Sequence, residues 1–90
     1  MANEEQVEIL KQGADVWNAW REEHPFERID LSGAYLSEAK LTRTELSGAD
    51  LRDASLNNAS LRGASLRGAN LRGANLSYAS LRGANLSNAN

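Results

Sequence analysis

Few residues of this chain have the type and spacing that acid-base chemistry requires. Asp50 and Asp53 are two carboxylates three residues apart, which could act as general acid and base only if a cleft enclosed them. His24 is the only histidine, the chain has no cysteine, and no metal ligand or nucleophile stands at a suitable spacing from His24. We therefore predict no catalytic, cofactor-binding or metal-binding residues, and we expect that the protein is not an enzyme.

Basic side chains suggest a second kind of chemistry, the binding of anions. Residues 1–28 contain seven acidic and three basic residues, whereas residues 29–90 contain five acidic and seven basic residues. Beyond Asp53 there is no acidic residue at all. Arginines that converge on one surface attract carboxylates and phosphates. Whether Lys40, Arg43, Arg62 and Arg82 converge depends on how residues 29–90 fold.

Leucine occupies every fifth position from residue 31 to residue 86, and an alanine stands two residues before each leucine except at Ile29 and Thr44. Five steps of an α-helix turn a side chain by about 140°, and five steps of a strand move it to the opposite face, so neither element gives these leucines a common core. We nevertheless predict that all of them form the core: Leu31, Leu36, Leu41, Leu46, Leu51, Leu56, Leu61, Leu66, Leu71, Leu76, Leu81 and Leu86.

A short extended segment followed by a corner explains this period. Alanine and leucine two residues apart point to the same side of an extended segment, and the two residues after the leucine are glycine or mostly polar, as corners require. Glu38 and Arg43 indicate that glycine is preferred at the second corner position but is not required. A chain built this way winds into a solenoid whose turns pair through backbone hydrogen bonds. We expect Asp30, Asp50 and Asn70, each before a leucine, to bond to the backbone near the corners.

The unit Ala-(Asp/Asn)-Leu-x-x, as in Ala49-Asp50-Leu51 and Ala69-Asn70-Leu71, resembles the pentapeptide-repeat family over residues 29–90. The resemblance implies an all-β solenoid, a right-handed quadrilateral β-helix with four repeats per coil and therefore about three coils. The preceding segment, from Ile9 to Arg21, resembles the helical leader of cyanobacterial-type members. In those proteins the repeats often accompany a signalling or membrane module.

Four repeats per coil would place residues 39–43, 59–63 and 79–83 on one face. That face would carry a charge of +4, and the other three faces −1, −1 and zero. It is either a solvated surface or a strip that binds phosphate, nucleic acid or an acidic partner. Aromatic residues for base stacking are absent from it, which disfavours nucleic acid. Its basic residues, here called the basic face, are Lys40, Arg43, Arg62 and Arg82.

Residues 4–22 predict one amphipathic α-helix, with Asn3 as its N-cap and Pro25 ending it. Gly13 lies near the middle of the apolar arc, where we expect another backbone to come close. We predict that this arc is a cap that covers the N-terminal end of the first coil together with Phe26. The alternative is a membrane-surface or partner-binding helix, although the acidic polar face disfavours an anionic membrane. The predicted cap residues are Val7, Leu10, Ala14, Trp17 and Trp20.

The composition predicts one small unit with two parts, an N-terminal capping helix and linker over residues 1–28 and a β-helix over residues 29–90. The lack of cysteine is compatible with a reducing compartment. No apolar run approaches the length of a membrane span, and the acidic start lacks the features of a secretory signal. We therefore expect a cytoplasmic location.

These features favour a non-enzymatic module with a structural or protein-interaction role. The partner is unknown, and an end-to-end homodimer through the C-terminal coil is a further hypothesis. One alternative is a protein that mimics DNA and interacts with topoisomerases, as the resemblance implies for some members, although the short and net basic solenoid disfavours it. Another alternative is anion or nucleic-acid binding through the basic face. We expect no cofactor.

Overall fold

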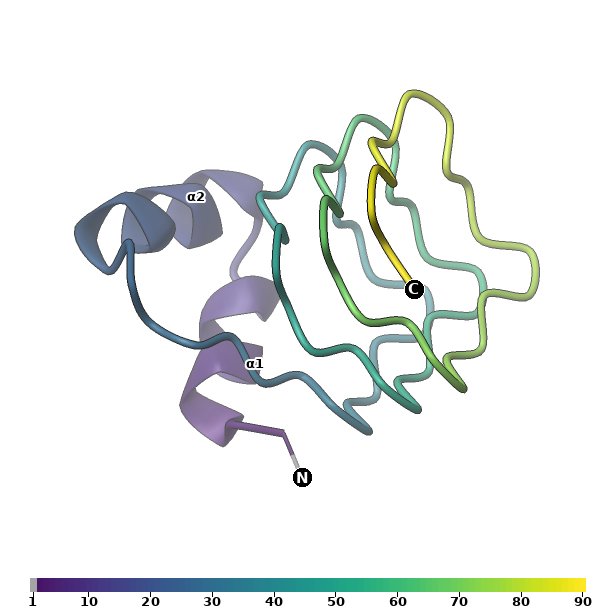
Figure 1. The fold of residues 1–90 in the computed structure, drawn as a ribbon, viewed down its shortest axis with the longest axis horizontal. Helices are drawn as coiled ribbons and strands as arrows, with labels where there is room; N and C mark the ends of the chain where they lie inside the picture. Colours follow the sequence, from purple (N-terminus) through teal and green to yellow (C-terminus); the bar gives the residue numbers. More distant parts are fainter. Residues whose placement is uncertain (1) are drawn as a thin grey trace.

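The computed structural model describes residues 2–90, which form two short helices followed by a coiled chain. Helix α1 spans Glu4–Lys11 and helix α2 spans Ala14–Glu23. From residue 30 onward, the regular pairing within the described residues consists of isolated parallel β-bridges rather than extended strands. Figure 1 shows the coils stacked side by side, with both helices at the end where the repeats begin.

The bridges repeat with a period of twenty residues. Asp30 pairs with Asp50, which in turn pairs with Asn70, and three further columns of bridges follow the same rule. In the first column, the N–H of Leu31 donates to the C=O of Asp50 at 2.8 Å, and the N–H of Asp50 donates to the C=O of Ile29 at 2.9 Å. Four five-residue repeats therefore make one turn of the coil.

Leucine and alanine side chains fill the inside of the coil. The leucines from Leu31 to Leu66 are buried, while Leu71, Leu76 and Leu81 are partly buried. Leu86 is 42% exposed, so its prediction as a core residue is wrong. Burial falls along the repeats because, within residues 2–90, the last turn packs against a neighbouring turn on one side only.

Each corner contains one residue in the left-handed backbone region. Gly33 has φ 70°, and the non-glycine residues at the same repeat position behave alike, with φ 64° at both Glu38 and Arg43. This confirms that glycine is preferred there but not required. Glycine adopts this conformation without the steric cost that a Cβ introduces.

The predicted single helix over residues 4–22 is wrong, because the chain breaks into α1 and α2 at Gln12 and Gly13. Gly13 has φ 113°, which directs α2 away from the axis of α1. A straight helix of nineteen residues would be about 28 Å long, nearly the full length of a molecule whose extents are 31 × 27 × 25 Å. The expected close approach of another backbone is also wrong, since nothing lies within 4 Å of a Cβ built on Gly13.

The helices pack their apolar side chains against the first coil. Val7, Leu10 and Trp17 are buried and belong to the same core cluster as the leucines, and Trp20 packs against it while partly exposed. Ala14 is also partly buried. Phe26 is 96% exposed, so its predicted place in the cap is wrong. It follows Pro25 in the segment beyond α2, where the chain has already left the space that the two tryptophans fill.

Side chains of α1 complete the hydrogen bonds of the first coil on the face formed by residues 29–33. The amide of Gln6 donates to the C=O of Arg28 at 2.7 Å and accepts from the N–H of Asp30 at 2.8 Å. The N–H of Asn3 donates to the C=O of Asp30 at 2.8 Å. Asn3 also accepts from the N–H of Gln6, which confirms it as the N-cap of α1.

Side chains of α2 do the same on the face formed by residues 44–48. The amide of Asn18 donates to the C=O of Arg43 at 3.0 Å and accepts from the N–H of Glu45 at 2.8 Å. The indole N–H of Trp17 and a guanidinium N–H of Arg21 both donate to the C=O of Glu45, at 2.8 and 3.3 Å. On these two faces the helices therefore take the place of a preceding coil.

Candidate functional site

Three of the four residues of the basic face surround one open depression. The N–H of Arg43 donates to the C=O of Arg62 at 2.8 Å, and the N–H of Gly63 donates to the C=O of Arg82 at 2.8 Å, so these corners stack directly on one another. The depression has a volume of about 560 Å³. Its lining residues are Thr42, Arg43, Ser60, Arg62, Gly63, Arg82 and Gly83.

The stacking of the corners directs these groups to one place. A Cβ built on Gly63 would lie 3.3 Å from Cγ of Arg43, which shows that the stem of Arg43 lies over the glycine of the next coil. The hydroxyls of Thr42 and Ser60 are 3.1 Å apart and share a hydrogen bond. Guanidinium N–H groups and hydroxyls are donors suited to carboxylate or phosphate oxygens. Sequence reasoning assigned no role to the two hydroxyls, although they lie in the residue ranges of this face.

Lys40, the fourth residue of the basic face, lies apart from this depression. It lines a groove beside α1 together with Lys11, Tyr35 and Leu41. Lys40 and Arg43 belong to the same coil, but Lys40 stands before the leucine and forms the bridge to Ser60, whereas Arg43 stands at the corner that stacks on Arg62. The face predicted from the repeat register therefore contains an arginine cluster and a separate lysine.

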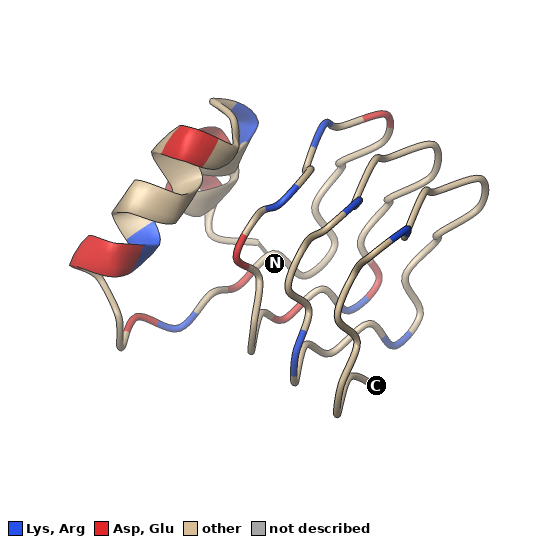
Figure 2. Ribbon diagram, turned by 90° about the horizontal axis from the view of Figure 1, so that it is seen from above, with Lys and Arg blue, Asp and Glu red and all other residues tan. Residues whose placement is uncertain are grey.

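The arginines of the depression have no acidic partner among residues 2–90, where the one ion pair joins Arg52 to Asp50 at 2.7 Å. Figure 2 shows basic positions recurring from coil to coil, while acidic positions concentrate on the helices and on the coils near them. The hydrogen bond from Arg52 lowers the pKa of Asp50 below its ordinary value. Asp50 is thus neutralised by its own neighbour on a different face.

Glu45 is the acidic residue most closely tied to the helices. Burial raises the pKa of its carboxyl, but hydrogen bonds from Ser47 and the nearby charge of Arg21 outweigh burial and lower that pKa overall. Burial also lowers the pKa of Arg21, against the opposing effect of Glu45. This pair contributes to anchoring α2 and is distinct from the arginines of the depression.

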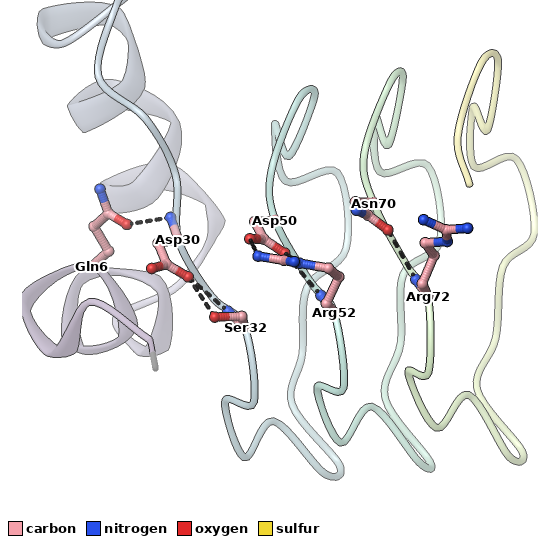
Figure 3. A network of polar contacts seen from close by, with 7 residues as sticks. All are labelled: Gln6, Asp30, Ser32, Asp50, Arg52, Asn70 and Arg72. Carbon is pink, nitrogen blue, oxygen red and sulfur yellow. Dashed lines mark hydrogen bonds and ion pairs between the residues drawn. The ribbon is translucent and has the colours of Figure 1, made fainter.

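Polar residues before the leucines bond to the backbone two positions later, as predicted. The carboxylate of Asp30 accepts from both the N–H and the hydroxyl of Ser32, at 3.1 and 2.7 Å. The amide oxygen of Asn70 accepts from the N–H of Arg72 at 3.1 Å. Figure 3 shows this arrangement repeated along the column, beginning with Gln6 on Asp30. These groups act structurally, at the corners.

Nothing in the described residues assembles the other candidate sites. Asp50 is engaged by Arg52, and no group of three or more His, Cys, Asp or Glu side chains that could hold a metal ion is found within residues 2–90. The Nδ1–H of His24 donates to the C=O of Trp20, 2.9 Å away, and its ring stacks on the indole with centroids 4.7 Å apart. None of the helices in the described part has the length and hydropathy needed to cross a membrane.

The coiled part matches a known repeat. A family model described as eight copies of the pentapeptide repeat matches the chain twice, over residues 29–68 and 54–90. The chain belongs to the pentapeptide repeat family. Pentapeptide repeat proteins form right-handed quadrilateral β-helices and are generally structural repeat proteins. A search of curated protein sequences finds no match.

Solved structures of other pentapeptide repeat proteins resemble this chain. One, from the thylakoid lumen of Arabidopsis thaliana, is 48% identical with a TM-score of 0.66, over 68% of this chain and 42% of its own length. A second, HetL from the cyanobacterium Nostoc, is involved in the regulation of heterocyst differentiation; it is 44% identical with a TM-score of 0.65, over 67% of this chain and 29% of its own.

A third solved pentapeptide repeat protein, Rfr23 from the cyanobacterium Cyanothece, is 48% identical with a TM-score of 0.59, over 67% of this chain and 44% of its own. Cyanobacterial proteins are thus among the relatives, as predicted. This chain spans less than half the length of each of the three proteins. The similarity therefore concerns the repeat architecture.

Proposed function

We propose that this chain is a non-enzymatic protein-interaction module that binds an acidic partner protein through the basic face. The observation that carries the proposal is the depression surrounded by Arg43, Arg62 and Arg82, three guanidinium groups without a carboxylate partner among residues 2–90. Arginine binds carboxylates through two parallel hydrogen bonds, which gives geometric specificity as well as attraction.

The solenoid fixes the spacing of these donors. Arg62 and Arg82 occupy the same corner position in successive coils, which are separated by about 4.8 Å, and Arg43 lies beside them over Gly63. Like charges at this distance repel one another in the unbound protein, and a bound carboxylate relieves that repulsion. A rigid row of this kind suits an acidic segment with several carboxylates more than it suits a single small anion.

The test compares two double variants that remove the same charge from the same corner position. In Arg62→Ser/Arg82→Ser the cluster is disrupted, whereas in Arg67→Ser/Arg72→Ser two exposed arginines on other faces are removed. Fluorescence anisotropy with labelled poly-L-glutamate should show salt-sensitive binding that the first variant loses and the second retains. Equal binding by both variants would overturn the proposal, and so would binding of duplex DNA or heparin in preference to poly-L-glutamate.

The architecture that we propose has two parts. Residues 29–90 form a right-handed quadrilateral β-helix of about three coils, and residues 1–28 supply the cap and a linker. The hydrogen bonds from Gln6 and Asn18 to the first coil support the capping role. The prediction that a single helix caps the coil is replaced by a cap of two helices, α1 and α2.

Two further expectations belong to this proposal. The partly exposed Leu76, Leu81 and Leu86 support an end-to-end homodimer through the C-terminal coil. Light scattering of the native chain and of Leu86→Glu tests the homodimer, and a native chain that is monomeric at every concentration contradicts it.

A cytoplasmic location stays a prediction, since one similar protein comes from the thylakoid lumen. The net basic solenoid still disfavours a DNA mimic.

A further inference from the structure

The two helices form hydrogen bonds with the backbone of two faces of the first coil and not with the backbone of the other two. In each later coil, the residue before the leucine receives its N–H and C=O partners from the coil before it, as Asp50 does from Ile29 and Leu31. Asp30 and Glu45 obtain equivalent partners from Asn3, Gln6, and α2. Two of the four edges of the first coil are therefore complete.

Tyr35 and Lys40 hold the same repeat position on the two remaining faces. Their bridges to Ser55 and Ser60 use the backbone groups of the residues on either side of them, as in the bond from Leu36 N–H to Ser55 C=O at 2.8 Å. The N–H and C=O of Tyr35 and Lys40 themselves point toward the side of the helices. No hydrogen bond to any of these four groups is found within residues 2–90. An unpaired edge of this kind is a template for a further strand.

A groove lies along this unpaired edge, between α1 and the coil. It has a volume of about 500 Å³, and its apolar lining includes Leu10, Leu36, Ala39 and Leu41. A second depression of about 350 Å³ continues it past Val7 and Ala34, sharing Lys11 and Tyr35 with the first. The charged residues that line the groove itself are two lysines, Lys11 and Lys40, and Tyr35 beside them is 73% exposed.

We propose that this groove binds an acidic segment of a partner protein, which adds to the first coil as a further turn would, extended along each face and bent at the corner between Tyr35 and Lys40. The segment would exchange backbone hydrogen bonds with Tyr35 on one face and with Lys40 on the next, pack apolar side chains against Ala39 and the exposed ring of Tyr35, and direct a carboxylate toward Lys11 and Lys40. Because α1 lines the other side of the groove, a single peptide segment fits it better than the folded surface of a second copy. This site is separate from the arginine depression.

The test uses the full chain and capped peptides of sequence Ala-Thr-Leu-Ser-Gly-Ala-Glu-Leu, in which glycine allows the corner, observed by amide chemical shifts. We expect the shifts to centre on Tyr35, Ser37 and Lys40. A peptide methylated on alternate backbone nitrogens keeps its side chains but cannot pair, and should lose these shifts. Replacing the glutamate by glutamine, or Lys11→Ser/Lys40→Ser in the protein, should weaken binding by roughly three- to fivefold.

The variant Arg62→Ser/Arg82→Ser serves as the control, because it should leave peptide binding in the groove unchanged and so separates this inference from the proposed function. Four results would overturn the inference. They are the absence of shifts at millimolar peptide, shifts confined to the arginine depression, equal binding of the methylated peptide, and self-association of the free chain through Tyr35 and Lys40.

Discussion

Gln6 and Asn18 form equivalent hydrogen bonds with the first coil, at backbone positions that are three repeats apart. Each side-chain amide donates to one carbonyl oxygen, that of Arg28 or Arg43, and accepts from the N–H two residues later, that of Asp30 or Glu45. An amide has both a donor and an acceptor, as a peptide group does, so each side chain can replace one peptide unit of a preceding coil. Two helices thereby complete a β-type edge without contributing a strand.

Replacing Gln6 with alanine should lower the free energy of unfolding by about 2–3 kcal/mol, because two backbone groups at a buried position lose their partners. The same change at Asn18, which is more exposed, should cost about 1–2 kcal/mol. Urea unfolding measures both. Gln12→Ala, at an exposed position between the helices, is the control and should stay within about 0.5 kcal/mol of the native chain. A similar small effect for Gln6 would contradict the capping role.

Trp17 should be the aromatic residue on which stability depends most. Its ring is fully buried and its indole N–H donates to Glu45 C=O at 2.8 Å, so we expect Trp17→Phe to cost about 2–3 kcal/mol, since the backbone acceptor loses a partner and the core loses volume. Thermal and urea unfolding provide the measurement. Phe26→Ala, at a position that is 96% exposed, should have no measurable effect. A larger loss at Phe26 than at Trp17 would show that the cap packs differently.

The corner conformation can be probed at Gly48, where φ is 72° and nothing lies within 4 Å of a built Cβ. Gly48→Ala should therefore cost about 1–2 kcal/mol for backbone conformation alone. Gly48→Asn should cost less, because Asn58 already adopts φ 63° at the equivalent position. Equal stability of the alanine variant and the native chain in urea unfolding would refute this reasoning.

Acid should destabilise the protein through a few identifiable carboxyls. The hydrogen bonds from Ser32 lower the pKa of Asp30, and the pKa values of Glu45 and Asp50 are lowered as well. Their stabilising contribution is complete above the ordinary carboxyl pKa of about 4. It is lost as pH falls through the lowered values, because the unfolded chain then binds more protons.

Urea midpoints at pH 7, 5 and 3 test this dependence. Asp30→Asn should keep its bond at neutral pH, as Asn70 does with Arg72 at the same position, and should reduce the loss of stability in acid. If the native chain became more stable as pH falls from 5 to 3, that result would contradict the expected pH dependence.

The repeat was predictable because every unit obeys one local rule. The spacing of Leu31 and its successors indicates a coil with one corner per repeat, and the same rule assigns Asp30 and Asn70 to the corners. The four repeats per turn came from the resemblance to the pentapeptide-repeat family, and the twenty-residue period of the bridges agrees with it. The break at Gly13 was not predictable from the apolar pattern, since an amphipathic arc continues unchanged through a kink. The conformation at Gly13, with φ 113°, depends on how two helices fit one end of the coil.

The surface was less predictable than the core. The face assignment groups Lys40 with Arg43, Arg62 and Arg82, but Lys40 stands before its leucine and lines the groove beside α1, whereas the three arginines stand at the corner after a leucine. Asn18 gave no signal, because it occurs on the polar side of the predicted helix. Its role comes from its hydrogen bonds to the backbone of Arg43 and Glu45. The sequence pattern of α2 does not show which edge of the coil this helix contacts.

The most direct test of the proposed function is a titration of the full chain with a short poly-glutamate peptide, followed through the Nε–Hε signals of the arginine side chains. The signals of Arg43, Arg62 and Arg82 should shift together and saturate, and 0.5 M salt should abolish the shifts, because screening weakens exposed ion pairs. Arg67 and Arg72, on other faces, should not move. Shifts of equal size at Arg67 and Arg72, or none at the three arginines of the depression, would contradict the account.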